Sequence, residues 1–252
     1  DLGEIYAPLK GLRYRFNFGP DFRYYRNGTF RNEESISSEG KNRASLSNQS
    51  DFSWTLDNLI YYDKEFGKHS VGLTLLQSAT GYHYEESSMA AEGIPLESAK
   101  WNALSKENVS LLDEWNSGLI EKQLLSYMFR VNYDYNNKYL LTVSGRWDGA
   151  SQLAEGNKWA FFPSAALGWR LDQEEFLKDV TWLNQLKFRL GVGVTGNSAI
   201  DPYQTKGAIV SLYYPFGSAL APGYAASEPL IKDGAVAMAN KNLSWEKTTQ
   251  YN

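Results

Sequence analysis

The feature that most constrains this chain is an alternation of side chains with a period of two residues. It is clearest over residues 125–135, where apolar and aromatic residues at odd positions alternate with polar or longer residues at even positions. Side chains two residues apart share one face of a β-strand, so the segment predicts a strand with one apolar and one polar face. A helix would need a period of 3.6 residues instead. The fold class that follows is all-β.

The same alternation predicts about eight strands along the chain. They are expected at residues 9–19, 50–62, 69–84, 125–135, 139–148, 159–171, 186–195 and 243–252. Asn136 and Asn137 separate two of these segments, and asparagine tolerates positive φ angles. We therefore expect a tight hairpin at this point and antiparallel pairing of the flanking strands.

The odd-numbered connections between these segments are mostly long, and the even-numbered ones are mostly shorter. The long, polar ones are residues 20–49, 85–122, 149–158 and 196–242, and the shorter ones are 63–68, 136–138 and 172–185. Short turns at one end and long loops at the other are typical of an antiparallel membrane barrel. Within the second long connection, residues 96–115 have helical spacing of apolar residues and predict a short helix that caps the loop.

The aromatic content also favours a membrane barrel. The 252 residues include 17 Tyr and 8 Trp, although the mean hydropathy is only −0.47. A membrane barrel combines an apolar lipid face, a polar lumen and aromatic belts at both interfaces. The aromatic residues beside the short turns and those beside the long loops fit two such belts. They are Tyr61, Tyr62, Tyr133, Tyr135 and Tyr139 in the first set, and Tyr82, Tyr84, Trp147, Trp159 and Phe161 in the second.

Other classes of function find little support. A net charge of −4 offers no basic face for nucleic acid, and the absence of cysteine excludes disulfides and thiolate metal sites. The only histidines are His69 and His83, so a histidine metal site is not expected. Residues 191–196 spell G-x-G-x-x-G, but inside a predicted strand, where a dinucleotide fingerprint does not belong. We therefore expect no catalytic residue, no metal and no cofactor, and the chain is not expected to be an enzyme.

Four blocks resemble one family. They are YLLTVSGRWDGAS at 139–151, KWAFFPSAALGWR at 158–170, LKFRLGVGVTGN at 186–197 and NLSWEKTTQYN at 242–252. In this order they resemble barrel strands of SusC/RagA-type TonB-dependent outer-membrane transporters. The first half of the chain fits that family by pattern more than by motif.

The resemblance implies an all-β antiparallel transmembrane β-barrel segment, about eight strands of a barrel of ~22 strands. Residues 1–252 would belong to the TonB-dependent receptor β-barrel domain, and no plug domain is found. It also implies the outer membrane of a Gram-negative bacterium, import of a nutrient (an oligosaccharide before a peptide), and two partners, a SusD-like surface lipoprotein and the TonB system. The alternative left open by the residues is a soluble, surface-exposed glycan-binding β-sandwich.

Two groups of residues are candidate site residues. A row of arginines is expected to face the lumen and to pair with carboxylates of neighbouring strands or of a plug. It contains Arg130, Arg146, Arg170 and Arg189, with Arg13 and Arg15 nearer the start. Leu141, Val143, Phe188, Leu190 and Val192 are expected on the opposite, lipid-facing side. Aromatic residues of the long connections are expected to contact ligand or lid, or else to pack loop on loop. They are Trp101, Trp115, Tyr213, Tyr214 and Phe216.

Overall fold

The structure is a computed structural model. It describes residues 10–105, 111–177, 182–206, 210–216, 219–225, 230–232, 235–237 and 240–252, and for 111–114 and 210–239 only the course of the backbone. Among the described residues, no helix is long and apolar enough to cross a membrane.

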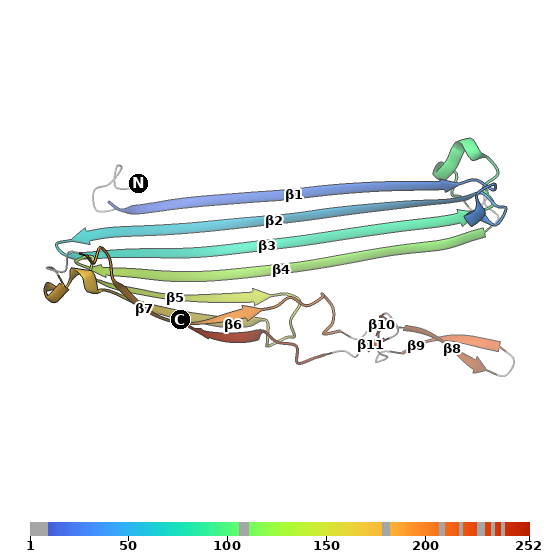
Figure 1. The fold of residues 1–252 in the computed structure, drawn as a ribbon. Coiled ribbons are helices and arrows are strands. Elements are labelled where there is room, and N and C mark those ends of the chain that lie inside the picture. Colours follow the sequence, from blue (N-terminus) through green and yellow to red (C-terminus); the bar gives the residue numbers. More distant parts are fainter. Residues whose placement is uncertain are drawn as a thin grey trace. The chain divides into compact units, whose positions relative to one another are not determined.

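Eight strands form one sheet in which each strand lies beside its neighbour in the chain (Figure 1). The order is β1 (Leu12–Arg31), β2 (Arg43–Phe66), β3 (His69–Glu92), β4 (Leu111–Tyr135), β5 (Tyr139–Ala150), β6 (Trp159–Arg170), β7 (Lys187–Asn197) and β12 (Glu246–Tyr251). Between β7 and β12 the chain forms two separate hairpins, β8 (Val210–Phe216) with β9 (Ala219–Ala225) and β10 (Leu230–Lys232) with β11 (Ala235–Ala237). The expectation of an antiparallel all-β sheet of about eight strands is confirmed.

The first four strands are much longer than predicted. They contain 20, 24, 24 and 25 residues. The predicted loops at 20–49 and 85–122 are therefore wrong in extent, because the connections are residues 32–42 and 93–110. The alternation fades in the extra length, as in Glu85, Glu86, Ser87 and Ser88, where both faces of the strand are polar. A strand with two wet faces has no contrast that a sequence pattern could detect.

The predicted helix at 96–115 is also mostly absent. In the described part of that range, a short 3₁₀ helix forms at Glu97–Asn102, and β4 begins at Leu111. The 3₁₀ helix is interrupted at Lys100, whose φ of 51° is not helical. The apolar spacing was misleading because part of it belongs to the strand.

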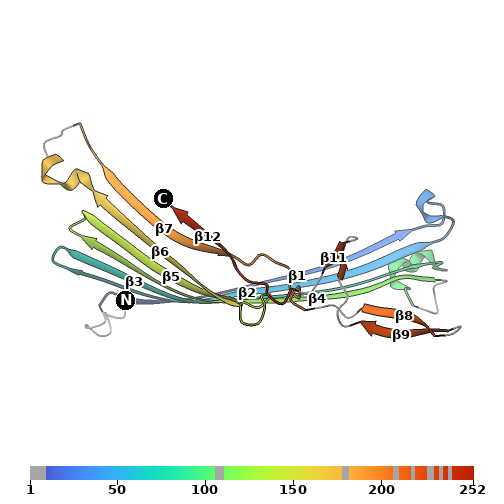
Figure 2. The ribbon, with the colours of Figure 1, turned by 90° about the horizontal axis from the view of Figure 1, so that it is seen from below.

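The contacts divide the chain into two compact units. Unit 1 contains Asp1–Phe18, Leu56–Thr80 and Gln123–Asn252, and unit 2 contains Gly19–Thr55 and Gly81–Lys122. Strands β1 to β4 contribute to both units, whereas β5, β6 and β7, which lie side by side in Figure 2, belong to unit 1.

The pairing register of unit 1 separates two faces. Leu141 lies opposite Leu167, and Leu167 lies opposite Leu190, so the three side chains share one face. Val143, Phe188 and Val192 lie on that side too, which we call the aromatic face. Arg146, Lys187 and Arg189 occupy alternate positions and lie on the other side, the polar face. The predicted separation of these two sets is confirmed.

Aromatic rings gather at both ends of the aromatic face. At the short-turn end the ring centroids of Tyr139 lie 6.3 Å from Tyr135 and 6.5 Å from Trp169. At the other end Trp159 lies 6.3 Å from Tyr127 and 5.9 Å from Trp147. Along β5 the two belts are about 26 Å apart at ~3.3 Å per residue. At the tilt of ~35–45° that is usual for barrel strands, this spacing corresponds to a height of about 20 Å, a little less than the usual apolar band of ~25 Å.

The hairpin between β4 and β5 has the predicted chemistry. Asn136 and Asn137 both have a φ of 55°, and the N–H of Lys138 donates to the carbonyl oxygen of Tyr135 at 3.0 Å. Consecutive positive φ angles are typical of a type I′ turn, whose twist matches that of the flanking strands.

The turn after β6 is held by two carboxylates. Glu174 accepts hydrogen bonds from the Tyr139 hydroxyl and the Trp169 indole, both at 2.9 Å, and forms an ion pair with Lys138. Asp172 accepts hydrogen bonds from Gln173 Nε2 at 2.9 Å, Arg170 Nη2 at 2.8 Å and the Leu186 N–H at 3.3 Å.

The two carboxylates are therefore stabilised in their ionised form. The bonds from Gln173 and Arg170 lower the pKa of Asp172 to about 2, and the bond from Lys138 lowers the pKa of Glu174.

Replacing Asp172 with asparagine should loosen this turn in a pH-dependent way. Because the folded pKa of Asp172 is depressed, its contribution is complete above about pH 4 and is lost as the pH falls towards the folded value. In the full-length protein in detergent, Asp172→Asn should lower the melting temperature by a few degrees at pH 7, and the difference should vanish near pH 2. The exposed Glu155→Gln serves as the control. Equal melting temperatures at pH 7 would contradict the assignment.

Candidate functional site

The polar face of unit 1 is built around hydrogen-bonded side chains. Arg146 Nε donates to both carboxylate oxygens of Asp148 at 2.8 Å, and its Nη2 donates to the Ser126 hydroxyl at 2.8 Å. The side chain of Asp148 is 10% exposed and Ser126 is 1% exposed. A desolvated carboxylate and an arginine that satisfy each other fix the guanidinium in one position.

The other predicted arginines differ in their partners. Arg170 pairs with Asp172 in the following turn, and Arg13 pairs with Asp63 on the neighbouring strand. Arg130 and Arg189 are exposed, and no carboxylate partner is found for either among the described residues. The expected pairing with a carboxylate of a neighbouring strand therefore holds for Arg13, whereas Arg146 and Arg170 each pair with a carboxylate two residues later in their own stretch of chain.

Side-chain hydroxyl groups link the strands of the same face. The Thr142 hydroxyl donates to Asn132 Oδ1 at 2.9 Å, and the hydroxyl groups of Ser144 and Ser164 lie 2.7 Å apart. Nearer the start of the unit, Ser78 donates to Asp57 at 2.6 Å. Such cross-strand pairs let a polar surface remain ordered without an apolar layer over it.

The connection between β5 and β6 carries a small core of its own. Leu153 and Ala154 are 2% and 3% exposed. The Ala154 N–H donates to the Leu243 carbonyl at 3.1 Å, and the Trp245 indole donates to the Lys158 carbonyl at 2.8 Å. Residues 151–158, predicted as a plain polar loop, are therefore fixed to the segment that leads into β12.

In unit 2, two hairpin connections are joined by a group of side chains that we call the loop clasp, Lys41, Asn42, Arg43 and Glu92. The Glu92 carboxylate lies 2.6 Å from Lys41 Nζ and 3.4 Å from Arg43 Nη2. The side chain of Glu92 is only 9% exposed, and the bond from Lys41 lowers its pKa. Asn42 adds backbone contacts, because its carbonyl accepts from the Gly93 N–H at 2.9 Å and its Nδ2 donates to the Ile94 carbonyl at 3.1 Å.

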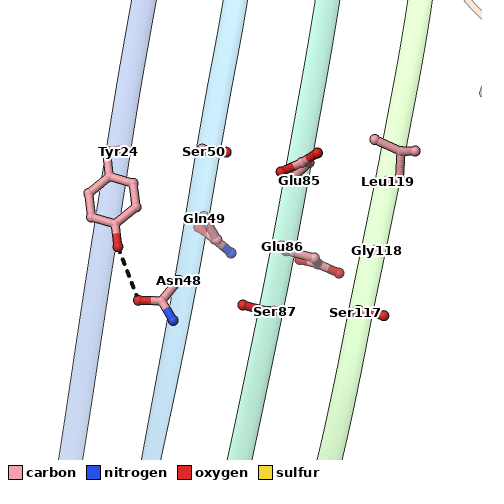
Figure 3. Close-up of a pocket in the computed structure, with 10 residues that line it drawn as sticks. All are labelled: Tyr24, Asn48, Gln49, Ser50, Glu85, Glu86, Ser87, Ser117, Gly118 and Leu119. Atoms are coloured by element: carbon pink, nitrogen blue, oxygen red, sulfur yellow. Dashed lines mark hydrogen bonds between the residues drawn. The ribbon is translucent and has the colours of Figure 1, made fainter.

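A polar groove of about 510 Å³ crosses the same unit (Figure 3). Figure 3 shows Tyr24 on β1 bonded to Asn48 on β2, with Glu85 and Glu86 on β3; the Tyr24 hydroxyl donates to Asn48 Oδ1 at 3.3 Å. Glu85 and Glu121 each bind one ring nitrogen of His83 at 3.0 Å, from opposite sides of the imidazole. In the described part of the chain, no group of three or more acidic or histidine side chains could hold a metal ion.

The aromatic candidates are placed differently from one another. Trp101 packs over Gly28, where an added Cβ would lie 2.4 Å from its ring, so it joins its loop to β1. Trp115 lies within β4 rather than in a loop and is 81% exposed. Tyr213, Tyr214 and Phe216 belong to β8, but their side chains lie outside the described residues. The structure does not bring the candidates into one pocket among the residues it describes.

Sequence reasoning missed the loop clasp and the two turn carboxylates. Glu92 and Glu174 are single acidic residues among many, and their partners come from other connections. The only available signal was that Asp148 and Asp172 each stand two residues after an arginine, a spacing that places both side chains on one face of a strand.

These features define a class of protein. A single sheet of consecutive antiparallel strands, polar on one face, aromatic on the other and belted at both ends, is a segment of an outer-membrane-type β-barrel. A soluble sandwich would need a second large sheet over the aromatic face, and besides this sheet the described residues form only the two-stranded pairs β8–β9 and β10–β11.

Comparison with known proteins places the chain in a family. Residues 6–252 match the family described as TonB dependent receptor-like, beta-barrel. The chain belongs to this family, whose members are outer-membrane transporters and receptors of Gram-negative bacteria.

Among curated relatives, the chain is 33% identical over 259 residues to TonB-dependent receptor SusC of Bacteroides thetaiotaomicron, covering 95% of this chain and 24% of that protein. It is 32% identical over 251 residues to TonB-dependent receptor P26 of Formosa agariphila, covering 96% and 24%. The chain thus spans about a quarter of the length of these relatives.

Solved structures share the fold. The RagAB peptide transporter matches with a TM-score of 0.80 at 21% identity, over 97% of this chain and 26% of that one. The RagAB peptide importer in its open-open state matches with a TM-score of 0.82 at 22% identity, over the same shares. The resemblance to the SusC/RagA type is confirmed, and the soluble sandwich is excluded.

Replacing Glu92 with glutamine should open the loop clasp. The neutral amide loses both ion pairs, so the amide hydrogen of Gly93, which bonds across the two connections, should exchange several-fold faster at neutral pH. Hydrogen exchange of the full-length protein followed by mass spectrometry measures this directly. Glu97→Gln, an exposed change in the nearby 3₁₀ helix, should leave the rate unchanged. If both variants behave alike, Glu92 does not hold the connections together.

Proposed function

We propose that this chain forms part of the barrel wall of a SusC-like TonB-dependent transporter in the outer membrane of a Gram-negative bacterium. The observation that carries the proposal is the separation of faces in unit 1. Exposed apolar and aromatic side chains cover one face, including Phe161 at 48% and Leu190 at 53% exposure. The other face carries arginines and hydroxyl ladders. The aromatic face then contacts lipid, and Arg130, Arg146, Arg170 and Arg189 line the lumen.

The length pattern of the connections supports an orientation. On one side the turns at 67–68 and 136–138 are short, although the connection at 171–186 is longer. On the other side the connections at 32–42, 93–110 and 198–245 are long, although the one at 151–158 is short. Short turns belong on the periplasmic side of such barrels and long loops on the outside. The loop clasp and the connection at 198–245 accordingly face the cell exterior.

The substrate is a nutrient. An oligosaccharide is our first choice, because 95% of this chain matches SusC. A peptide is the second choice, since the RagAB structures are described as peptide transporters. A SusD-like surface lipoprotein is the partner at the outer loops, and the TonB system supplies energy through other parts of the transporter. The plug domain is likewise assigned to other parts. Growth of a strain lacking the full-length transporter, on oligosaccharides or on peptides as the carbon source, separates the two substrates.

The wall itself makes and breaks no bond. Its carboxylates are engaged in structural contacts, as in the pairs of Asp148 with Arg146 and of Glu174 with Lys138. Its contribution to transport is to exclude lipid from a hydrated path and to present a polar surface to whatever passes.

Placing an arginine on either face tests the orientation. Val143 lies mid-strand on the aromatic face, and Thr142 lies beside it on the polar face. In the full-length transporter, Val143→Arg should destabilise the barrel by ~2–4 kcal/mol, the cost of a mid-membrane arginine facing lipid. Thr142→Arg should be tolerated because its side chain enters the lumen.

The measurement is the fraction of heat-modifiable, folded barrel in isolated outer membranes, with urea titration of that fraction. Val143→Arg should reduce it and Thr142→Arg should not. The reverse ranking would place lipid on the arginine face and would overturn the proposed wall.

The two tryptophans among the candidate site residues, Trp101 and Trp115, should respond differently to truncation. Trp115→Ala removes an exposed ring and should lower nutrient or lipoprotein binding several-fold without changing the melting temperature. Trp101→Ala removes the ring that covers Gly28 and should loosen the outer connection. Uptake of labelled oligosaccharides, co-purification of the lipoprotein and thermal melting distinguish these results. Unchanged uptake and co-purification for Trp115→Ala would remove that residue from the candidate site.

A further inference from the structure

A groove of about 430 Å³ lies on the aromatic face of unit 1. Ile60 and Leu75 form one side of it, and Phe129 and Phe161 form the other. Gly145 separates these two phenylalanines, and a Cβ at Gly145 would lie 2.6 Å from both rings. Only glycine lets the rings approach so closely over β5. The volume falls in the range of ~300–1,000 Å³ that is usual for pockets that bind small molecules.

One end of this apolar groove is polar. The Tyr14 hydroxyl donates to Asn58 Oδ1 at 2.6 Å, and Asn58 Nδ2 donates to Gln77 Oε1 at 2.6 Å. The row ends at Gln77, a half-buried side chain that lines the groove with Asn58. For Gln77 Nε2 the described residues provide no acceptor, so two N–H groups remain for a ligand.

The polar end lies at the level of an aromatic belt. Gln77 lines the groove together with Tyr127 and Trp147, which are directly paired across β4 and β5 and stand at the long-loop end. Phe129 and Leu75 lie one step further toward the short turns, within the apolar band. In the orientation proposed above, polar lipid groups meet the Gln77 end in the outer leaflet, and acyl chains extend along the apolar walls.

We propose that this groove is a binding site for an acyl chain of an outer-leaflet glycolipid, with a carbonyl or hydroxyl oxygen of its linkage accepting a hydrogen bond from Gln77 Nε2. The inference rests on the proposed function, because it needs the aromatic face to contact the membrane. Lipid A matches the site in chemistry, since its acyl chains carry ester, amide and hydroxyl oxygens close to the headgroup.

The complementarity lies in both polarity and position. An N–H group without an acceptor costs free energy in hydrocarbon. A lipid oxygen at the level of the belt would accept the hydrogen bond from Gln77 Nε2 that the strands do not accept. The apolar walls offer an acyl chain more contact than a flat surface would. A water molecule could satisfy Gln77 but would leave the apolar part of the groove without an occupant of matching chemistry.

The test uses the full-length transporter in detergent, titrated with lipid A and followed by native mass spectrometry. The wild-type protein should bind lipid A in preference to a phosphatidylethanolamine of similar chain length. Gln77→Leu should weaken lipid A binding roughly three- to tenfold, the range expected for one hydrogen bond. Leu75→Trp should abolish binding by filling the groove. Leu167→Trp, a change on the same face outside the groove, should bind as the wild type does.

Binding is measured only on the heat-modifiable, folded fraction, so that misfolding cannot imitate loss of the site. Equal lipid A binding by the wild type and Leu75→Trp would overturn the inference, and so would equal binding of phosphatidylethanolamine. If the arginine variants at 142 and 143 behave as expected while lipid A binding is unaffected by Leu75→Trp, only the groove assignment fails. If Val143→Arg folds normally, the proposed wall itself fails.

Discussion

The structure depends on the register in which its strands pair. In hydrocarbon no water replaces a lost backbone hydrogen bond, so strands that cross a membrane must satisfy one another's N–H and C=O groups. Because side chains alternate with a period of two, a slip of one residue in β7 would place Arg189 opposite Leu167, where Leu190 now lies. It would exchange the two faces along the whole strand. Residues paired across neighbouring strands, such as Val143, Ala165 and Val192, therefore all lie on the same face of the sheet. The separation of faces, the belts and the groove all follow from this register.

The sequence predicted the strands best where the two faces differ. The segment from Leu125 to Tyr135 alternates strictly, and the turn at Asn136 and Asn137 has the positive φ angles that asparagine tolerates. Beyond the belts the contrast between the faces is weaker: β2 begins with the mostly polar residues 43–50, and β3 continues through the polar residues 85–88, where no alternation marks a strand. Backbone pairing decides the strand there, and pairing depends on the neighbouring strand rather than on the local sequence.

The candidate site was predictable only in part, for a related reason. The arginines could be assigned to one face by counting in twos, and two of their partners follow at the same spacing, Asp148 after Arg146 and Asp172 after Arg170. The loop clasp could not be found in this way, because Lys41 and Glu92 lie 51 residues apart in the sequence and meet only when β2 and β3 have paired. Gln77 was equally hidden, since Asn58 and Gln77 lie on different strands and the sequence does not show that the two amides meet.

The distribution of charge partners across the sheet has a consequence for transport. Arg146 and Arg170 are neutralised by carboxylates within their own stretch of chain, so their positions are fixed by the wall alone. Arg130 and Arg189 lie on the same face without such partners among the described residues. A guanidinium can satisfy five donors only with acceptors such as water, a carboxylate of another domain or the oxygens of a passing ligand. In the proposed lumen, Arg146 and Arg170 therefore have a structural role. Arg130 and Arg189 keep N–H donors available for a passing ligand or for another domain. The proposed wall is consequently not uniform: Arg146 and Arg170 form fixed ion pairs, whereas the exposed Arg130 and Arg189 can exchange bound water for a polar nutrient or a plug surface.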